Sequence, residues 1–196
     1  MKIDKMQQKE LEKHIKEQAK TLGYKVMNGF LYSCIEEDLV SVTYVVVNSS
    51  RLVYTVKIKK FSYDNIFWDI INMPENKSQP ISLRVNGAFK APSIIISKGA
   101  IELTSDVFSV AVSFCKAVVN DVMEFRAKND VNNYVIDNTS IPYSSTLKCL
   151  AYIDLCNPSL AIEVARSAIE AGDVRGGVEN EGNGFFEWVL LRYDYS

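Results

Sequence analysis

The sequence predicts an α+β fold: an antiparallel sheet of about five to seven strands, helices on one side of it, and a C-terminal helical section. An amphipathic helical pattern opens the 196-residue chain and is followed by alternating segments rich in β-branched residues. The Val-rich segment 106–128 carries its polar residues at helical spacing, and the chain after Asn129 has a helical texture. Together these observations predict a sheet with helices packed on it.

The first predicted helix covers residues 4–22. Its apolar positions recur at spacings of four, four and three and form one narrow stripe: Leu11, Ile15, Ala19 and Leu22. Gly23 can end this helix, because glycine readily adopts a left-handed backbone. The only histidine of the chain, His14, is one position off the stripe. We therefore expect His14 to face solvent.

Four segments then predict strands of an antiparallel meander with one face covered: 24–27, 30–35, 40–47 and 52–59. Asn28-Gly29 supplies a two-residue turn between the first two strands. In the fourth strand, Lys57 and Lys59 alternate with apolar residues. We expect these two lysines to point toward water.

The following segment predicts a helix and further strands. Ser62 can cap a short helix that runs to Met73, where a proline ends it. Strands are predicted over three more ranges: 81–85, 89–96 and 101–103. Asn86-Gly87 marks the turn between the first two, and Pro92 favours an edge strand or a bulge.

Residues 106–128 are predicted to form one long, mostly buried helix capped by Ser105. The polar residues decide between helix and strand, because they fall at spacings of four, three, four and four: Ser109, Ser113, Lys116, Asn120 and Glu124.

After a polar loop at 129–145, helices are predicted over residues 146–156, from Pro158 to Gly172, and over 185–195, the last of them heavily aromatic. The glycine- and acid-rich segment 173–184 is predicted to be a flexible loop. We expect a sheet domain at 1–128 and a helical section at 129–196 that packs on it, together forming one structural unit.

The charge of the chain is unevenly distributed. Net charge is −2, but residues 129–196 hold ten acidic and four basic residues. This balance gives no general attraction to nucleic acid or to an anionic membrane. An acidic C-terminal third is typical of a solvated surface, and the sharper alternative is a basic partner.

Few residues of the chain suit catalysis or metal binding. One histidine and four dispersed cysteines do not supply a zinc site, so no metal, cofactor or catalytic residue is predicted. Cys115, Cys149 and Cys156 lie in apolar segments and are expected to be reduced core residues. No signal peptide or membrane span is recognised. Together with free thiols, this favours a cytoplasmic location.

The candidate partner-binding residues come from two features. The 173–184 loop is acidic and would repel phosphate, so its residues Asp173, Glu179 and Glu181 suit recognition of a protein instead. Aromatic residues that favour interfaces when exposed are Tyr63, Trp68 and Trp188. An aromatic last helix would also suit a homodimer.

The opening pattern resembles small, uncharacterised bacterial α+β proteins in which a helix ends at a Gly-aromatic pair before a strand meander. The residues that carry this likeness are Thr21-Leu22-Gly23-Tyr24-Lys25 and Asn28-Gly29-Phe30-Leu31-Tyr32. Some proteins of this build are immunity proteins that neutralise a toxin by binding it. The resemblance implies a binding function.

The sequence thus favours a non-catalytic, cytoplasmic protein-binding module without nucleic-acid or membrane partners; its specific form would be an immunity-type inhibitor of a basic toxin. One alternative is an enzyme with carboxylate or cysteine chemistry, for which a deep pocket should converge on Asp64, Glu36 or Cys34. A structural homodimer is the other alternative.

Overall fold

The computed structural model describes residues 2–27 and 29–194. It confirms the α+β class, with a five-stranded antiparallel sheet, helices that pack on it and a C-terminal helical section. The chain forms two compact units, which we call unit 1 (Met1–Ile58 with Ile95–Lys128) and unit 2 (Lys59–Ile94 with Asn129–Ser196). No pattern in the sequence indicated that Lys59–Ile94 groups with the C-terminal section.

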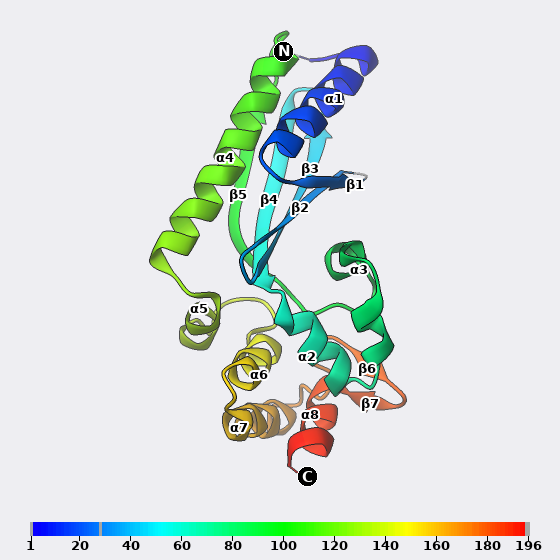
Figure 1. Cartoon of the computed structure of the whole chain (residues 1–196), viewed down its shortest axis with the longest axis vertical. Helices are drawn as coiled ribbons and strands as arrows, with labels where there is room; N and C mark the ends of the chain where they lie inside the picture. The colour runs from blue at the N-terminus through cyan, green and yellow to red at the C-terminus, as the bar shows by residue number, and fades with distance from the viewer. Residues whose placement is uncertain (1, 28, 195–196) are drawn as a thin grey trace. The chain divides into compact units, whose positions relative to one another are not determined.

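Unit 1 contains most of the sheet, whose strands follow one another in chain order. They are β1 (Lys25–Met27), β2 (Phe30–Ile35), β3 (Asp38–Val47), β4 (Arg51–Lys60) and β5 (Ile94–Glu102). Met27 pairs with Phe30 across the predicted first turn, although Asn28 of that turn lies outside the described residues. Because β5 is last in the order, it forms an edge of the sheet (Figure 1).

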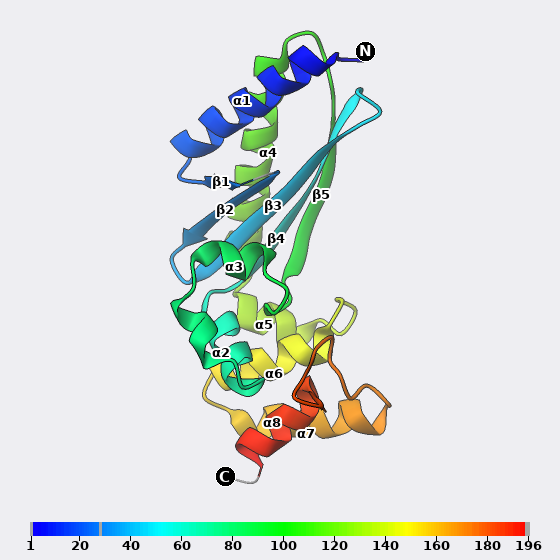
Figure 2. The same cartoon turned by 90° about the vertical axis from the view of Figure 1, so that its right-hand side faces the viewer.

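Helices α1 (Lys5–Thr21) and α4 (Val107–Lys128) pack against each other in unit 1 (Figures 1 and 2). The predicted stripe of α1 is buried at Leu11, Ile15 and Ala19. The Asp4 carboxylate caps α1 by accepting hydrogen bonds from the Met6 and Gln7 amides, each at 2.8 Å. The helix predictions for residues 4–22 and 106–128 are confirmed.

The cap of α4 differs from the prediction. Asp106, not Ser105, accepts the hydrogen bond from the Ser109 amide at 3.0 Å. Farther along α4, Phe114 contacts the rings of Tyr44 and Tyr54, with centroids 5.3 and 5.4 Å away. Since side chains alternate along a strand, α4 covers the sheet face that carries these two tyrosines.

Unit 2 is mainly helical. Its helices are α2 (Ser62–Ile70), α3 (Ile81–Asn86), α5 (Val131–Asp137), α6 (Ser144–Asp154), α7 (Pro158–Glu170) and α8 (Phe185–Tyr193), with a 3₁₀ turn at Pro74–Ser78. Figure 1 shows α6, α7 and α8 packed side by side. Phe67 of α2 stacks on Phe185 of α8 at 5.5 Å, which joins the two helices in one core.

Several predicted elements of unit 2 were wrong. Residues 81–86 form a helix, because Pro80 is followed by a turn in which the Gly87 amide donates to the Leu83 carbonyl. The strand predicted at 89–96 begins only at Ile94, and it continues as one strand to Glu102, inside the short strand predicted at 101–103. The polar loop predicted at 129–145 contains the helix α5. The helix α2 ends at Ile70, before the predicted Met73. Ser62 is the first residue of α2 and not its cap, and no side chain caps this helix by a hydrogen bond.

The segment 173–184 is more ordered than predicted. It contains a two-stranded hairpin, β6 (Glu179–Asn180) and β7 (Asn183–Gly184). The Thr146 hydroxyl donates to the Gly176 carbonyl at 2.9 Å, and the Asn180 side chain donates to the Ile71 carbonyl at 2.7 Å. These bonds fix the loop to α6 and α2.

Candidate functional site

Two of the predicted partner-binding aromatics are core residues of unit 2. Tyr63 and Trp68 have no exposed surface. The Tyr63 hydroxyl donates to the Asn132 side chain at 2.8 Å, and the Trp68 indole donates to the Phe89 carbonyl at 2.7 Å. With their polar atoms satisfied internally, these residues stabilise the core and offer nothing to a partner.

The three predicted loop acids are exposed, but each takes part in a local interaction. Asp173 accepts a hydrogen bond from the Gly176 amide at 3.0 Å. Glu179 pairs with Arg175 at 3.2 Å, and Glu181 accepts from the Asn72 side chain at 3.2 Å. Each carboxylate therefore has a partner within unit 2 and remains exposed to solvent.

Trp188 is half-buried on α8, and its indole donates to the Asn180 carbonyl at 3.1 Å. Phe185, Phe186 and Val189 of the same helix are buried within unit 2. Tyr195, predicted as part of this aromatic helix, lies outside the described residues. The aromatic face of α8 thus packs within the core of unit 2.

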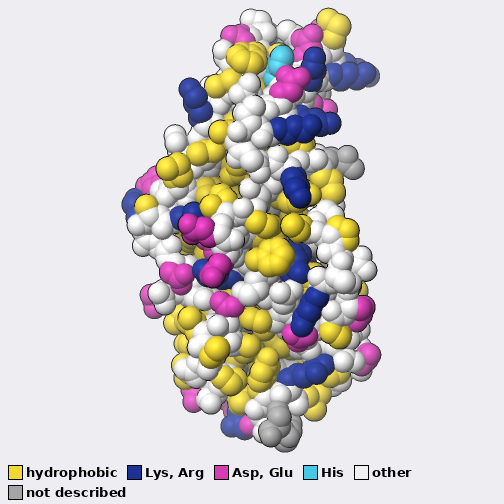
Figure 3. Space-filling view, viewed as in Figure 1, with side chains coloured by type: hydrophobic (Ala, Val, Ile, Leu, Met, Phe, Trp, Pro, Cys, Tyr) yellow, Lys and Arg dark blue, Asp and Glu magenta, His cyan; other side chains and the backbone are white. Residues whose placement is uncertain are grey.

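The acidic C-terminal third does not form a continuous acidic surface on the face seen in Figure 3. Among the described residues over α6–α8, acidic side chains are scattered between apolar ones on that face. Further acids from this part of the chain have partners: Asp130 pairs with Lys60 at 3.3 Å, and Asp194 with Arg166 at 2.7 Å. The charge excess is therefore weak support for a basic partner.

Three residues singled out by sequence lie differently than expected. His14 is half-buried, because its ring packs edge-on against Phe108 at 5.3 Å. Lys59 is 1% exposed and belongs to a buried charge cluster with Asp64, instead of facing water. Cys156 is exposed after the end of α6, whereas Cys115 and Cys149 are buried as predicted.

The residues proposed for an enzyme are in ion pairs or on the surface. Asp64 is fully buried and accepts from Lys59 and the Ala91 amide, at 2.8 and 2.9 Å. Glu36 pairs with Arg126, and Cys34 is exposed.

Within residues 2–27 and 29–194, no three or more His, Cys, Asp or Glu side chains gather where they could hold a metal ion. In that same range, no helix combines the length and apolarity needed to cross a membrane.

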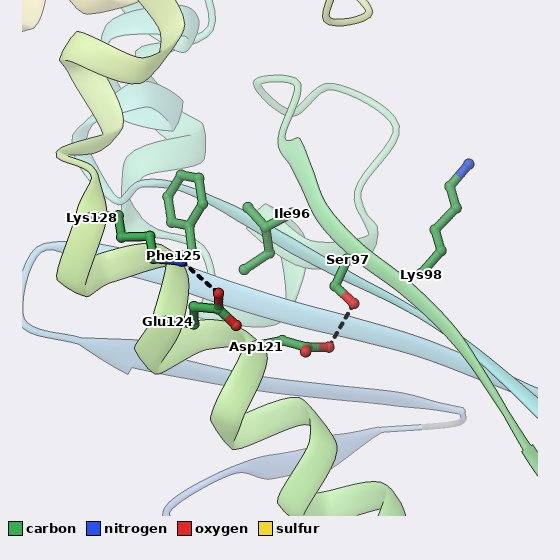
Figure 4. A pocket seen from close by; sticks show the side chains of 7 residues that line it. All are labelled: Ile96, Ser97, Lys98, Asp121, Glu124, Phe125 and Lys128. Atoms are coloured by element: carbon green, nitrogen blue, oxygen red, sulfur yellow. Dashed lines mark hydrogen bonds and ion pairs between the residues drawn. The ribbon is translucent and has the colours of Figure 1, made fainter.

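A surface groove that the sequence did not indicate lies in unit 1, between β5 and the C-terminal half of α4. Its volume is about 390 Å³, and its lining comes from both elements: Ile96, Ser97, Lys98, Asp121, Glu124, Phe125 and Lys128. Figure 4 shows Ser97 and Asp121 turned toward each other and Lys98 pointing away. Such a trough beside an edge strand suits a flat, extended ligand.

Asp121 is the carboxylate in this groove that is available to a cation. The Ser97 hydroxyl donates to it at 2.6 Å, and in the described part of the chain no lysine or arginine pairs with it. Glu124, in contrast, pairs with Lys128 at 2.6 Å. Burial raises the pKa of Tyr54, and the negative charge of Asp121 adds to this shift.

The backbone of β5 completes the groove. β5 is last in the strand order, so one of its edges has no neighbouring strand among the described residues. The amides and carbonyls on such an edge can pair with another extended chain. A Cβ on Gly99 would come within 2.3 Å of the Tyr54 ring, so glycine lets β5 pack closely on β4.

Sequence reasoning missed Ser97 and Asp121 because their residue types are ordinary and 24 positions separate them. The one available signal was that Asp121 adjoins Asn120 of the polar stripe on the predicted helix. Comparisons with protein-family models, curated proteins and solved structures found no match for this chain.

Proposed function

We propose that this chain is a non-catalytic protein-binding module that takes up an extended segment of a partner protein along the free edge of β5. The observation that carries this proposal is the groove between that edge and α4. Main-chain hydrogen bonds to an edge strand give affinity for any extended peptide, and side chains in the adjoining groove give specificity.

Charge narrows the partner to a segment with a lysine or arginine opposite Asp121. That carboxylate accepts a hydrogen bond from the neutral Ser97 hydroxyl and has no lysine or arginine partner in the described part of the chain. A charge-assisted hydrogen bond is stronger than a neutral one, so a cationic side chain is the preferred occupant. The basic partner expected from the sequence is retained, on the ground of Asp121 instead of the acidic C-terminal third.

An immunity-type inhibitor of a basic toxin is one protein with these properties, and we keep it as the specific form of the proposal. Its cytoplasmic location remains an inference from cysteines that form no disulfide. An enzyme built on Asp64, Glu36 or Cys34 is less favoured, because Asp64 is buried in an ion pair with Lys59 and Glu36 pairs with Arg126. A homodimer through α8 is less favoured, because its aromatic face is buried within unit 2.

Selection of random peptides on the immobilised protein tests this function. Peptides with alternating apolar residues and one lysine or arginine should be enriched, and an enriched peptide should bind in fluorescence anisotropy. We expect Asp121→Asn to weaken that binding about three- to tenfold. Glu10→Gln, which removes an exposed acid from α1, is the matched control and should have no effect.

Hydrogen exchange distinguishes strand addition from docking by side chains alone. When the selected peptide binds, amides of β5 should become protected, because they gain main-chain hydrogen bonds. Protection confined to other elements, an unchanged affinity of Asp121→Asn, or a selection without enriched peptides would each contradict the proposal.

A further inference from the structure

A second cavity lies in unit 1 between α1 and the sheet, apart from the β5–α4 groove. Its volume is about 320 Å³. Its apolar lining is Leu11, Ile15, Val45, Val46 and Leu52, and of these five residues Val45 and Val46 keep exposed surface that a ligand can reach. Sites for small organic molecules begin at about 300 Å³ and are lined mainly by apolar groups with a few polar ones. This cavity meets the volume criterion, and its wall offers both apolar and polar groups.

The polar groups of the cavity lie on two elements that face each other. Gln8 and Glu12 are one turn apart on α1, and Tyr44 is on β3. The Tyr44 ring packs against Phe114, which holds it in place. Burial raises the pKa of Tyr44, and the charge of Glu12 is the next cause, so the carboxylate and the phenol share one space.

Glu12 is available for a ligand. Within the described residues it forms no ion pair, although Lys9 and Lys16 lie three and four positions away on the same helix. A carboxylate beside apolar walls repels anions and leaves a neutral apolar ligand without a polar partner. A ligand with an apolar stem and a terminal cation would satisfy both parts of the cavity.

We propose that this cavity binds an organic cation with an apolar stem, of the alkylammonium or alkylguanidinium class. The stem lies against Val46 and the Tyr44 ring, which keep exposed surface, the cation pairs with Glu12, and the Tyr44 oxygen accepts a hydrogen bond from it. Lysine and arginine side chains of another protein carry this chemistry, as do free alkylamines. The neighbouring lysines of α1 limit the affinity, so binding of small probes is expected in the millimolar range.

The test is a titration of the ¹⁵N-labelled protein with hexylammonium, followed by NMR. Amides near Glu12 and Tyr44 should shift in a saturable way, whereas hexanoate should not bind. We expect Glu12→Gln to weaken hexylammonium about three- to fivefold and to leave the weaker binding of hexanol unchanged. Glu10→Gln, on another face of α1, is the matched control and should behave like the parent protein.

Val46→Met, which adds volume at the cavity wall, should weaken both hexylammonium and hexanol, and its NMR spectrum reports whether it folds. Equal affinity for hexanol and hexylammonium, no loss in Glu12→Gln, or no saturable shift would each overturn the proposal. A further titration with N-acetyl-lysine-N-methylamide distinguishes the two sources of the bound cation. Tighter binding of this derivative than of hexylammonium indicates a protein side chain, and the reverse order indicates a free alkylamine.

Discussion

The ammonium group of Lys59 donates a hydrogen bond to the Asp64 carboxylate at 2.8 Å, with both side chains excluded from solvent. Lys59 also donates to the carbonyls of Arg84 and Ala91, each at 3.0 Å. Burial lowers the pKa of Lys59 to about 8 despite the attraction of Asp64. One lysine therefore connects β4, α2, α3 and the segment that leads into β5.

Loss of this lysine should strongly destabilise the protein. Lys59→Met leaves Asp64 as a buried carboxylate without its closest cation, which typically costs about 3–5 kcal/mol. The free energy of unfolding, measured in urea by circular dichroism, should fall by that amount. Lys57→Met, two residues away and half-exposed, is the control and should change stability by less than about 0.5 kcal/mol.

Removing both charges should cost less than removing one. In Lys59→Met/Asp64→Leu, apolar side chains replace the ion pair, and such exchanges are often close to neutral. We expect the double variant to be more stable than Lys59→Met in the same urea titration. A double variant as unstable as the single one would mean that the hydrogen bonds from Lys59 to the two carbonyls dominate.

Alkaline pH should reduce the stabilisation that Cys115 provides. Burial raises the pKa of its thiol from 9.0 to about 11. The unfolded chain therefore loses this proton first, so the contribution is fully present below about pH 9 and is lost as pH rises through 11. The stability difference between the parent protein and Cys115→Ala should shrink over that range; a constant difference would contradict the shift.

Thiol labelling should separate the four cysteines into two pairs. Cys34 and Cys156 are exposed, whereas Cys115 and Cys149 are buried and burial raises the pKa of both thiols. At neutral pH, Ellman's reagent should modify the exposed pair rapidly and the buried pair only in denaturant. Mass spectrometry of the digested protein checks which residues react, and rapid labelling of Cys149 would show that its site opens readily.

Gly184 should resist substitution although it lies in a segment predicted to be flexible. A Cβ there would come within 2.3 Å of the Val174 carbonyl oxygen, a backbone atom that cannot move aside easily. We expect Gly184→Ala to cost about 2–3 kcal/mol of stability in a thermal or urea titration.

Gly182→Ala is the matched control for this prediction. Its Cβ meets nothing within 4 Å, and only the φ of +80° opposes it. The expected cost is about 1 kcal/mol. Similar costs for both variants would mean that the hairpin shifts to relieve the contact.

The long helices were predicted well because their periodicity extends over many residues. In α1 the apolar stripe of Leu11, Ile15 and Ala19 repeats over several helical turns, and so does the polar stripe of α4. Each repeat favours a helix over a strand. Residues 81–86 were assigned to the wrong class because so short a segment repeats neither period clearly. There, Pro80 and the turn at Gly87 favour a single helical turn.

The candidate site was much less predictable than the fold. The sequence correctly placed Cys115 and Cys149 inside, because apolar neighbours predict burial. It predicted that Lys59 faces water, whereas this side chain is buried. Alternation along a strand assigns a residue to one face of the sheet, but it does not show which other elements cover that face. Tyr63 and Trp68 were candidates for a surface only because composition does not tell an exposed aromatic residue from a buried one.

The sequence by itself determined the α+β class, the two long helices and the strand meander, because these follow from local periodicity and turn residues. The tertiary structure decided which polar residues meet. It brought Asp121 to Ser97 beside an edge strand, Glu12 to Tyr44 in a cavity and Lys59 to Asp64 in a core. Such contacts depend on how segments far apart in the sequence pack together, and the local residue pattern of one segment does not determine which other segment it packs against.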